Sequence, residues 1–298
     1  MDKTFPQVPF DVSMRPSEAY DRSLAARDRD WLFLKKLYLE NFLDLEAGRG
    51  GRYAIPKIIH QIWLGGELPE RFKGFQQSFR RLHPGWEYRL WGDTQAQQLE
   101  MSNRELFDRS PNYGSKSDLM RYEILFNYGG LYADVDFECL KPFDLLHRSL
   151  DFYTGVAYER HALLFNGLIG AAPRHPVIGR CLESAGAEGG KAGAPEADRI
   201  MDSTGPEYFT RCFRQTAPGL EGRIAALPAT YFYPFPGSQR FCRDRQKIRA
   251  FIQPESFCLH YWACSWVPRE KKGLAAGLVG GMYRLYKAVR GKKENQKR

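Results

Sequence analysis

Apolar residues recur at helical spacing in three segments of the chain. Residues 21–50 carry them three, four or seven positions apart, at Leu24, Trp31, Leu34, Tyr38 and Phe42. The segment SKSDLMRYEILFNYGG, residues 115–130, shows the same spacing, begins with serines that can cap a helix and ends in a double glycine. Both patterns predict helices, as does the amphipathic pattern of residues 69–82. Residues 1–20 are polar and broken by prolines, which predicts an irregular arm.

Strands are predicted where β-branched and aromatic residues form short apolar runs. KIIHQIWLGG, residues 57–66, is such a run closed by two glycines and predicts a buried first strand. Further strands are expected at 87–91, 152–157, 163–170 and 224–233, with helices near 176–186 and 205–215. Strands that alternate with helices favour an α/β fold with helices on both faces of a sheet.

Two aspartates interrupt an apolar run in NYGGLYADVDFECLKPF, residues 127–143. In an extended strand alternate side chains share a face, so Asp134 and Asp136 would point the same way. Two neighbouring carboxylates repel each other and lose hydration in such surroundings, and a bound cation relieves both costs. Their hard oxygen atoms suit Mg²⁺ or Mn²⁺. The alternative is a turn in which each aspartate caps a backbone amide, and the spacing alone leaves both open.

Composition places the chain among globular proteins, with 298 residues, 43% of them hydrophobic. The six cysteines are scattered without a Cys-x-x-Cys pair, which argues against a zinc site or a disulfide framework and favours a cytoplasmic protein. No apolar run approaches the roughly 18 residues that span a bilayer. The first twenty residues lack the apolar core of a signal peptide.

The net charge of +9 is concentrated at the C-terminus. Residues 269–298 hold ten Lys or Arg and two Glu, a charge of +8 that leaves about +1 for the rest. A nearly neutral body argues against nucleic acid as the substrate. In the same segment Leu274, Leu278, Met282, Leu285 and Val289 recur at helical spacing. Such a basic amphipathic helix can lie on an anionic membrane surface, or it can dock on the body of the protein.

Three further places in the chain carry candidate chemistry. Asp118 and Arg121 lie three apart near the start of a predicted helix, where they can bind hydroxyl or phosphate oxygens or form a surface ion pair. Trp63 ends the first predicted strand and can stack on a nucleotide base or fill the core. In CLHYWACSW, residues 258–266, His260 and Ser265 can join the aspartates around a cation, although a histidine among aromatic residues equally fits a core position.

The segments IPKIIHQIWLGG, SKSDLMRYEILFNYGGLYADVDF and HYWACSW, in this order, resemble glycosyltransferase family 32, the sugar transferases with an Asp-x-Asp motif. That family includes yeast-type α-mannosyltransferases, glycolipid synthases and bacterial capsule enzymes, and the clostridial toxin glucosyltransferases look like distant relatives. The resemblance is close over residues 55–146 and looser over 150–266. It implies a GT-A (Rossmann-like) fold with a mixed, mostly parallel sheet, a nucleotide-sugar donor, a divalent cation and retention of anomeric configuration.

By this resemblance, five positions would contact the donor. Trp63 would stack on the base, and Asp118 and Arg121 would bind hydroxyls of the donor sugar. Tyr132 would contact ribose, sugar or metal, and Asn166, in LFNGLIGA, would lie near the donor sugar. The segment TGPEYF, residues 204–209, also fits the family and would contribute its backbone.

A second group would hold the cation and the leaving diphosphate. Asp134 would contact the ribose, the sugar or the metal, and Asp136 would bind the metal directly. His260 and Ser265 would complete the metal and diphosphate site, and Trp266 would contact the leaving oxygen.

The sequence therefore predicts an N-terminal helical arm (1–54), a GT-A catalytic domain (55–268) and a basic amphipathic tail (269–298). We expect a cytoplasmic glycosyltransferase that uses Mn²⁺ or Mg²⁺ to move a hexose from a UDP- or GDP-sugar to a glycan or lipid-linked acceptor, in polysaccharide, capsule or glycolipid assembly. The entry strand is slightly more like uridine-binding relatives, and the tail predicts contact with the inner face of the membrane.

Two other functions remain as alternatives. A metal-dependent phosphotransferase or phosphatase also uses Asp-x-Asp, but would usually place it after the first strand with Thr or Val two residues on, where Glu138 stands here. A sugar-nucleotide-binding module without turnover would bind the donor and release no product.

Overall fold

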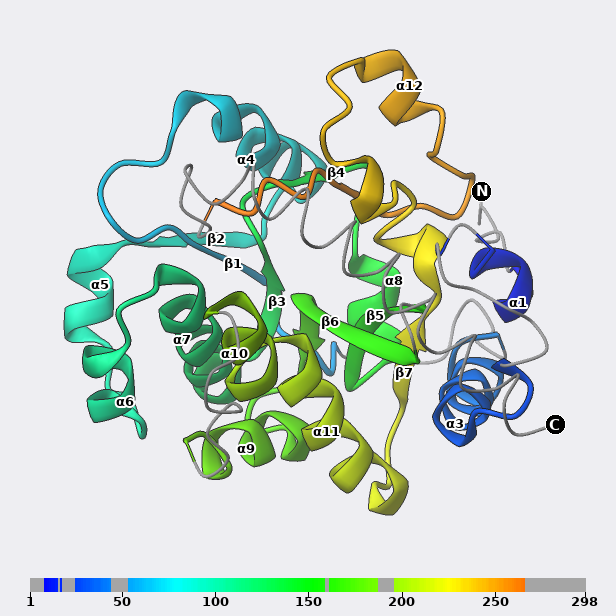
Figure 1. Cartoon of the computed structure of the whole chain (residues 1–298), viewed down its shortest axis with the longest axis horizontal. Helices are drawn as coiled ribbons and strands as arrows, with labels where there is room; N and C mark the ends of the chain where they lie inside the picture. The colour runs from blue at the N-terminus through cyan, green and yellow to red at the C-terminus, as the bar shows by residue number, and fades with distance from the viewer. Residues whose placement is uncertain are drawn as a thin grey trace, which may run out of the picture. The chain divides into compact units, whose positions relative to one another are not determined.

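A six-stranded mixed sheet forms the centre of the molecule (Figure 1). The computed structural model describes residues 8–15, 17, 25–43, 53–158, 161–186 and 196–265. Among them the strands of this sheet, in spatial order, are β2 (Glu87–Trp91), β1 (Ile58–Ile62), β3 (Gly130–Ala133), β6 (Ala162–Ala171), β5 (Phe152–Tyr158) and β7 (Ile224–Leu227). A separate two-stranded sheet pairs β4 (Phe137–Cys139) with β8 (Cys258–His260).

Only β6 runs against the other strands of the six-stranded sheet. It pairs antiparallel with both β3 and β5, whereas β1 is parallel to β2 and β3, and β5 is parallel to β7. A mixed, mostly parallel sheet with interspersed helices confirms the predicted α/β fold class. The strand positions confirm the predictions for 57–66, 87–91, 152–157 and 163–170.

The helices of the described residues include the five that the sequence predicted and six others that it did not. They are α1 (Phe10–Ser13), α3 (Arg29–Tyr38), α4 (Glu70–Leu82), α5 (Asp93–Gln98), α6 (Arg104–Arg109), α7 (Tyr113–Tyr128), α8 (Asp144–Ser149), α9 (Pro176–Glu183), α10 (Glu196–Ser203), α11 (Pro206–Thr216) and α12 (Arg245–Arg249). A π-helical turn, Leu39–Leu43, continues α3. In Figure 1, α7, α9, α10 and α11 gather on one side of the sheet, and the contacts of α7 with β3 and of α11 with β6 join them to it.

Helix α7 delivers the chain to the two aspartates. Asn112 caps it by accepting a hydrogen bond from the Gly114 amide at 2.7 Å, so the helix starts before the serines at 115 and 117 that the sequence suggested as caps. Gly129 ends it in a left-handed conformation, with φ of 62°. The next residue opens β3, whose four residues are buried. This abrupt connection fixes where the chain enters the sheet.

The N-terminal segment contributes to the same hydrophobic core as the sheet. Asp28 caps α3, and the core includes Trp31, Leu34, Tyr38 and Phe42. Phe10, from the short helix α1, packs edge-on against Trp31 with ring centroids 5.0 Å apart. The sequence predicted an irregular arm for residues 1–20, and this prediction is wrong for Phe10–Ser13, which form helix α1. Leu24 lies outside the described residues.

Strand β7 is shorter than the sequence predicted. Strand β7 ends at Leu227 instead of 233, because Pro228 has no amide to donate and a 3₁₀ turn, Ala229–Tyr231, follows. The predicted tail falls outside the described residues. Within the described residues no helix is long and apolar enough to cross a membrane. The chain divides into two compact units, Met1–Trp262 and Ala263–Arg298.

Candidate functional site

Asp134 and Asp136 lie in a turn between β3 and β4, and not in an extended strand as their alternation predicted. The Phe137 amide donates to the Asp134 carbonyl at 3.2 Å, which closes the turn. A turn was the alternative interpretation, and in it the Asp134 carboxylate contacts Tyr132 and Arg121 while that of Asp136 contacts His260. The turn therefore places two acidic side chains beside the end of a buried strand.

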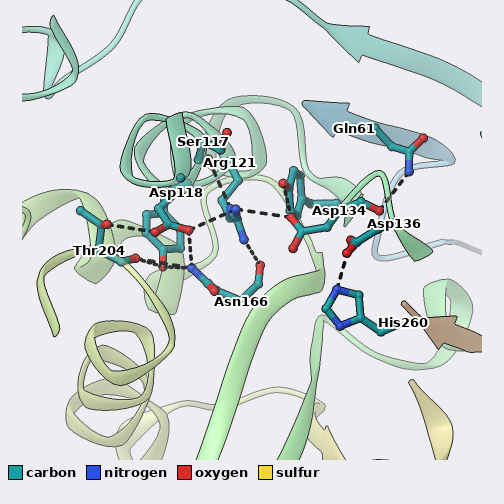
Figure 2. A network of polar contacts seen from close by, with 12 residues as sticks. Gln61, Ser117, Asp118, Arg121, Asp134, Asp136, Asn166, Thr204 and His260 are labelled. Atoms are coloured by element: carbon teal, nitrogen blue, oxygen red, sulfur yellow. Dashed lines mark hydrogen bonds and ion pairs between the residues drawn. The ribbon is translucent and has the colours of Figure 1, made fainter. Parts of the chain in front are cut away.

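The two aspartates and His260 form a cluster that can hold a metal ion, here called the DXD cluster. One ligand atom from each residue lies within 4.8 Å of the other two. Strand pairing brings the histidine there, because His260 on β8 is directly opposite Phe137 on β4. Its Nε2 atom lies 3.1 Å from Oδ1 of Asp136 (Figure 2). Among the described residues, the buried Nδ1 atom of His260 has no hydrogen-bond partner.

Asp134 is held from several sides. The Tyr132 hydroxyl donates to its Oδ1 at 2.6 Å, and Nη2 of Arg121 lies 3.4 Å from the same oxygen. Its amide donates to the Gly167 carbonyl on β6 at 2.8 Å. Burial raises the pKa of Asp134, and the Arg121 guanidinium partly opposes that rise. The carboxylate is therefore fixed in place before any ligand arrives.

Asp118 and Arg121 form a buried ion pair, so the surface ion pair that the sequence left open is excluded. Nη2 of Arg121 lies 3.1 Å from Oδ1 of Asp118, and the two side chains are 6% and 8% exposed. Nη1 of Arg121 donates to the Asn166 carbonyl at 2.6 Å. The guanidinium also lies over the Tyr132 ring, 4.5 Å from its centroid. Arg121 thus bridges Asp118, Asp134 and strand β6.

Two residues that the sequence did not single out complete what we call the Asp118 network, Asp118, Arg121, Tyr122, Asn166 and Thr204. Nδ2 of Asn166 lies 2.9 Å from Oδ1 of Asp118 and 3.0 Å from the Tyr122 hydroxyl. The Thr204 hydroxyl donates to Oδ2 of Asp118 at 2.9 Å (Figure 2). Burial raises the pKa of Asp118 to about 6, although Arg121 and Thr204 act to lower it. The one sequence signal for Thr204 was its place before Gly-Pro in TGPEYF.

Trp63 follows β1 at the same edge of the sheet. The carboxyl ends of the parallel strands β1 and β3 adjoin, and Nε2 of Gln61 donates to the Asp134 carbonyl at 3.2 Å. Trp63 is half-buried, and its ring packs on Phe72 with centroids 5.4 Å apart. Its Nε1 atom is buried and has no hydrogen-bond partner in the described part of the chain. Open α/β sheets bind ligands at this edge.

The structure thus brings together most of the predicted site residues. These are Asp118, Arg121, Tyr132, Asp134, Asp136, Asn166 and His260, and Trp63 lies at the same sheet edge, just after the strand whose Gln61 donates to the Asp134 carbonyl. Of the other two, Ser265 is exposed and belongs to the second compact unit, and Trp266 lies outside the described residues. The catalytic and binding roles of all ten residues remain predictions.

Comparisons with known proteins identify relatives of this chain. Residues 69–153 match the family described as glycosyltransferase sugar-binding region containing DXD motif. The inositol phosphoceramide mannosyltransferase 2 of Schizosaccharomyces pombe is 34% identical over 252 residues, which cover 76% of this chain and 71% of that protein. A mannosyl phosphorylinositol ceramide synthase of Saccharomyces cerevisiae is 33% identical over 54% of this chain and 42% of its own length.

Among solved structures, the PaToxG glycosyltransferase aligns with 67% of this chain and 80% of its own, at 18% identity and a TM-score of 0.49. The identity to the S. pombe mannosyltransferase extends over most of both chains, and the family match includes the two aspartates. The chain therefore belongs to the glycosyltransferases with a DXD-containing sugar-binding region, glycosyltransferase family 32, and has their GT-A fold.

Proposed function

We propose that this glycosyltransferase is a metal-dependent, retaining enzyme that moves a hexose from a nucleotide sugar to a glycan or lipid-linked acceptor. The observation that carries the proposal is the meeting of two groups at one sheet edge. The DXD cluster offers ligand atoms within 4.8 Å of one another, and the Asp118 network approaches it through the contact of Arg121 with Asp134. Retention of configuration rests on the family resemblance alone.

The donor set of the DXD cluster fits a divalent cation. Two carboxylates and an imidazole are ligands that Mn²⁺ accepts readily, and Mg²⁺ accepts the oxygens. The His260 ring faces the aspartates with Nε2, which lies 3.1 Å from Oδ1 of Asp136 and could bind the same ion. When bound, such an ion would neutralise charge that develops on the departing diphosphate. Ser265 remains a proposed additional ligand, and Trp266 a proposed contact to the leaving oxygen.

The Asp118 network would bind and orient the donor sugar. Asp118 and Arg121 are charged side chains held nearly without exposure, so a sugar hydroxyl beside them would meet groups that need no reorganisation. Asn166 is held by Asp118 and Tyr122 and would lie at the same sugar. Tyr132, beneath Arg121, would support both this network and Asp134. Trp63 would stack on the base.

The relatives guide the choice of donor and acceptor. Their names give inositol phosphoceramide as an acceptor and mannose as the transferred sugar for those proteins. We therefore propose a lipid-linked acceptor with a phosphorylated headgroup, and a mannose donor is the first to test beside UDP-sugars. The basic segment 269–298 would place the protein on the anionic inner face of a membrane, with the catalytic unit in the cytoplasm.

The test is release of nucleoside diphosphate from a panel of UDP- and GDP-sugars with Mn²⁺. The wild type should hydrolyse or transfer from one donor, and chelation with EDTA or Asp136→Ala should abolish release. Glu138→Gln is the matched control. Glu138 lies two residues after Asp136, but its carboxylate contacts Arg249 and Tyr261, at 2.6 and 2.7 Å, outside the cluster.

The same assay separates the alternatives. Calorimetric binding of a donor with Mn²⁺, but without product release even when candidate acceptors are added, would identify a binding module. Release of orthophosphate from phosphate esters would identify a phosphatase. Absence of both binding and release across the panel would refute the proposed function.

A further inference from the structure

Tyr233 carries a buried hydroxyl without a hydrogen-bond partner. The residue is 4% exposed, and its oxygen has no partner among the described residues. An unsatisfied buried hydroxyl destabilises the folded state, so such groups are uncommon in folded proteins. A tyrosine hydroxyl is protonated at neutral pH and can donate a hydrogen bond.

Two glycines make room for this side chain. A Cβ atom at Gly155 on β5 would fall 2.4 Å from Cε2 of the Tyr233 ring, which no real contact allows. A Cβ atom at Gly167 on β6 would fall 2.7 Å from Oδ2 of Asp134 and 3.5 Å from the Tyr233 oxygen. The tyrosine hydroxyl and the aspartate carboxylate therefore border the same space, which any side chain at position 167 would fill.

The ring of Tyr233 is fixed by aromatic neighbours. It meets His260 edge-on, with centroids 5.5 Å apart and planes at 87°, and it lies 4.9 Å from Phe165 and 5.6 Å from Trp262. The backbone is held as well, because the Tyr233 amide donates to the Ala229 carbonyl at 2.8 Å. The hydroxyl is thus held in a set position beside two members of the DXD cluster.

We infer that Tyr233 is a positioning residue for the donor, whose hydroxyl donates a hydrogen bond to an anionic oxygen of the nucleotide sugar's diphosphate. The inference rests on the proposed function, since the diphosphate is the group that the DXD cluster would hold. A protonated hydroxyl beside His260 and Asp134 needs an acceptor that arrives with the ligand, and phosphate oxygens are strong acceptors. The destabilisation caused by burying this hydroxyl without a partner is then offset when the donor binds.

The test compares two tyrosines of the same segment. Tyr231→Phe removes a satisfied hydroxyl, which lies 2.8 Å from the Tyr38 hydroxyl, and should lower the unfolding temperature. Tyr233→Phe removes an unsatisfied one and should leave the unfolding temperature unchanged or higher. With Mn²⁺ present, Tyr233→Phe should raise the Kd of UDP or GDP about tenfold by calorimetry, whereas Tyr231→Phe should not.

Each outcome decides a separate point. If the wild type binds a nucleoside diphosphate and Tyr233→Phe binds it equally well, the inference is wrong while the proposed function stands. If Tyr233→Phe weakens only the intact nucleotide sugar, the hydroxyl contacts the sugar, and the assignment to the diphosphate is wrong. A drop in unfolding temperature like that of Tyr231→Phe would make the role structural. If the wild type binds neither diphosphate, the proposed function itself fails.

Discussion

The Asp118 network and the DXD cluster adjoin each other but differ in how their polar atoms are satisfied. In the Asp118 network both carboxylate oxygens have partners, with Oδ1 near Arg121 and Asn166 and Oδ2 accepting from Thr204. In the DXD cluster Nδ1 of His260 is buried without a partner in the described part of the chain, and the hydroxyl of the adjacent Tyr233 is in the same state.

This difference separates a donor-binding region whose polar groups are already satisfied from one that still has groups for a ligand to satisfy. A fully satisfied buried network is rigid, and removal of one member leaves the others unpaired at a cost in stability. Unpartnered groups already carry that cost in the free protein, so their loss should affect ligand binding more than folding. Substitutions in the two regions should therefore change different measurements.

The largest effect is expected for Asp136→Asn in the DXD cluster. Loss of a metal-binding carboxylate should reduce the transfer rate about a thousandfold, because the ion supplies several kcal/mol of charge stabilisation. Stability should be unchanged or higher, since one of two neighbouring carboxylates loses its charge. Initial rates at saturating donor, calorimetric titration with Mn²⁺ and thermal unfolding measure the three quantities.

Glu138→Gln again serves as the control and should keep the wild-type rate and Mn²⁺ affinity. If Asp136→Asn instead lowered the unfolding temperature and left Mn²⁺ affinity intact, the contrast between the two regions would be reversed.

A pH dependence of stability should come from Asp118. Its pKa in the folded protein is raised to about 6 from 3.8, so between these values the folded state binds more protons than the unfolded state. The stability that this group contributes is therefore present below about pH 4 and lost as the pH rises through about 6. A shift of about two units corresponds to about 3 kcal/mol.

Asp118→Asn cannot titrate at this position and isolates the effect. The free energy of unfolding of the wild type minus that of the variant should fall across the window from about pH 4 to about pH 6 and stay level above it. Urea unfolding of both proteins at closely spaced pH values provides the comparison. Parallel profiles would show that Asp118 does not titrate in this range.

The local part of the site could be predicted from the sequence. Helical spacing in residues 115–130 and the double glycine placed α7 and the start of β3 to within a few residues. The order of the motifs, through the family resemblance, then added Asn166 and His260, which periodicity alone would have left in the core. The structure brings both to the aspartates, because β6 and β8 pair with the strands on either side of the turn.

The rest depended on contacts that no local pattern encodes. Alternation predicted an extended Asp-Val-Asp, whereas the hydrogen bond from Phe137 to Asp134 makes a turn. Thr204 comes from a connection 86 residues from Asp118, and a single hydroxyl in a loop has no period to reveal it. The unsatisfied state of Tyr233 is likewise a property of packing, since its sequence neighbours Tyr231 and Phe232 are also buried aromatics.

A smaller effect on stability is expected for Thr204→Val in the Asp118 network. Valine keeps the shape of threonine but leaves Oδ2 of Asp118 without its donor at 2.9 Å. The free energy of unfolding near pH 8 should fall by about 2 kcal/mol. Thr204→Ser keeps the hydroxyl and should recover most of that loss, as urea unfolding would show. If Thr204→Val kept the wild-type stability and Thr204→Ser lost it, the methyl group, and not the hydrogen bond, would matter.

The smallest effect is expected for Trp63→Ala at the same sheet edge. Stacking of a base on an aromatic ring contributes about 1–3 kcal/mol, so the Kd of UDP or GDP with Mn²⁺ should rise about tenfold. Trp63 also packs on Phe72, and a structural disturbance could weaken binding as well. Inorganic pyrophosphate separates the two causes because it has no base. A role in stacking requires that the variant bind pyrophosphate as the wild type does and lose affinity for the nucleotide alone, with Trp63→Phe in between. Equal weakening of both ligands would place Trp63 with the groups that keep the site in shape, and not with those that meet the donor.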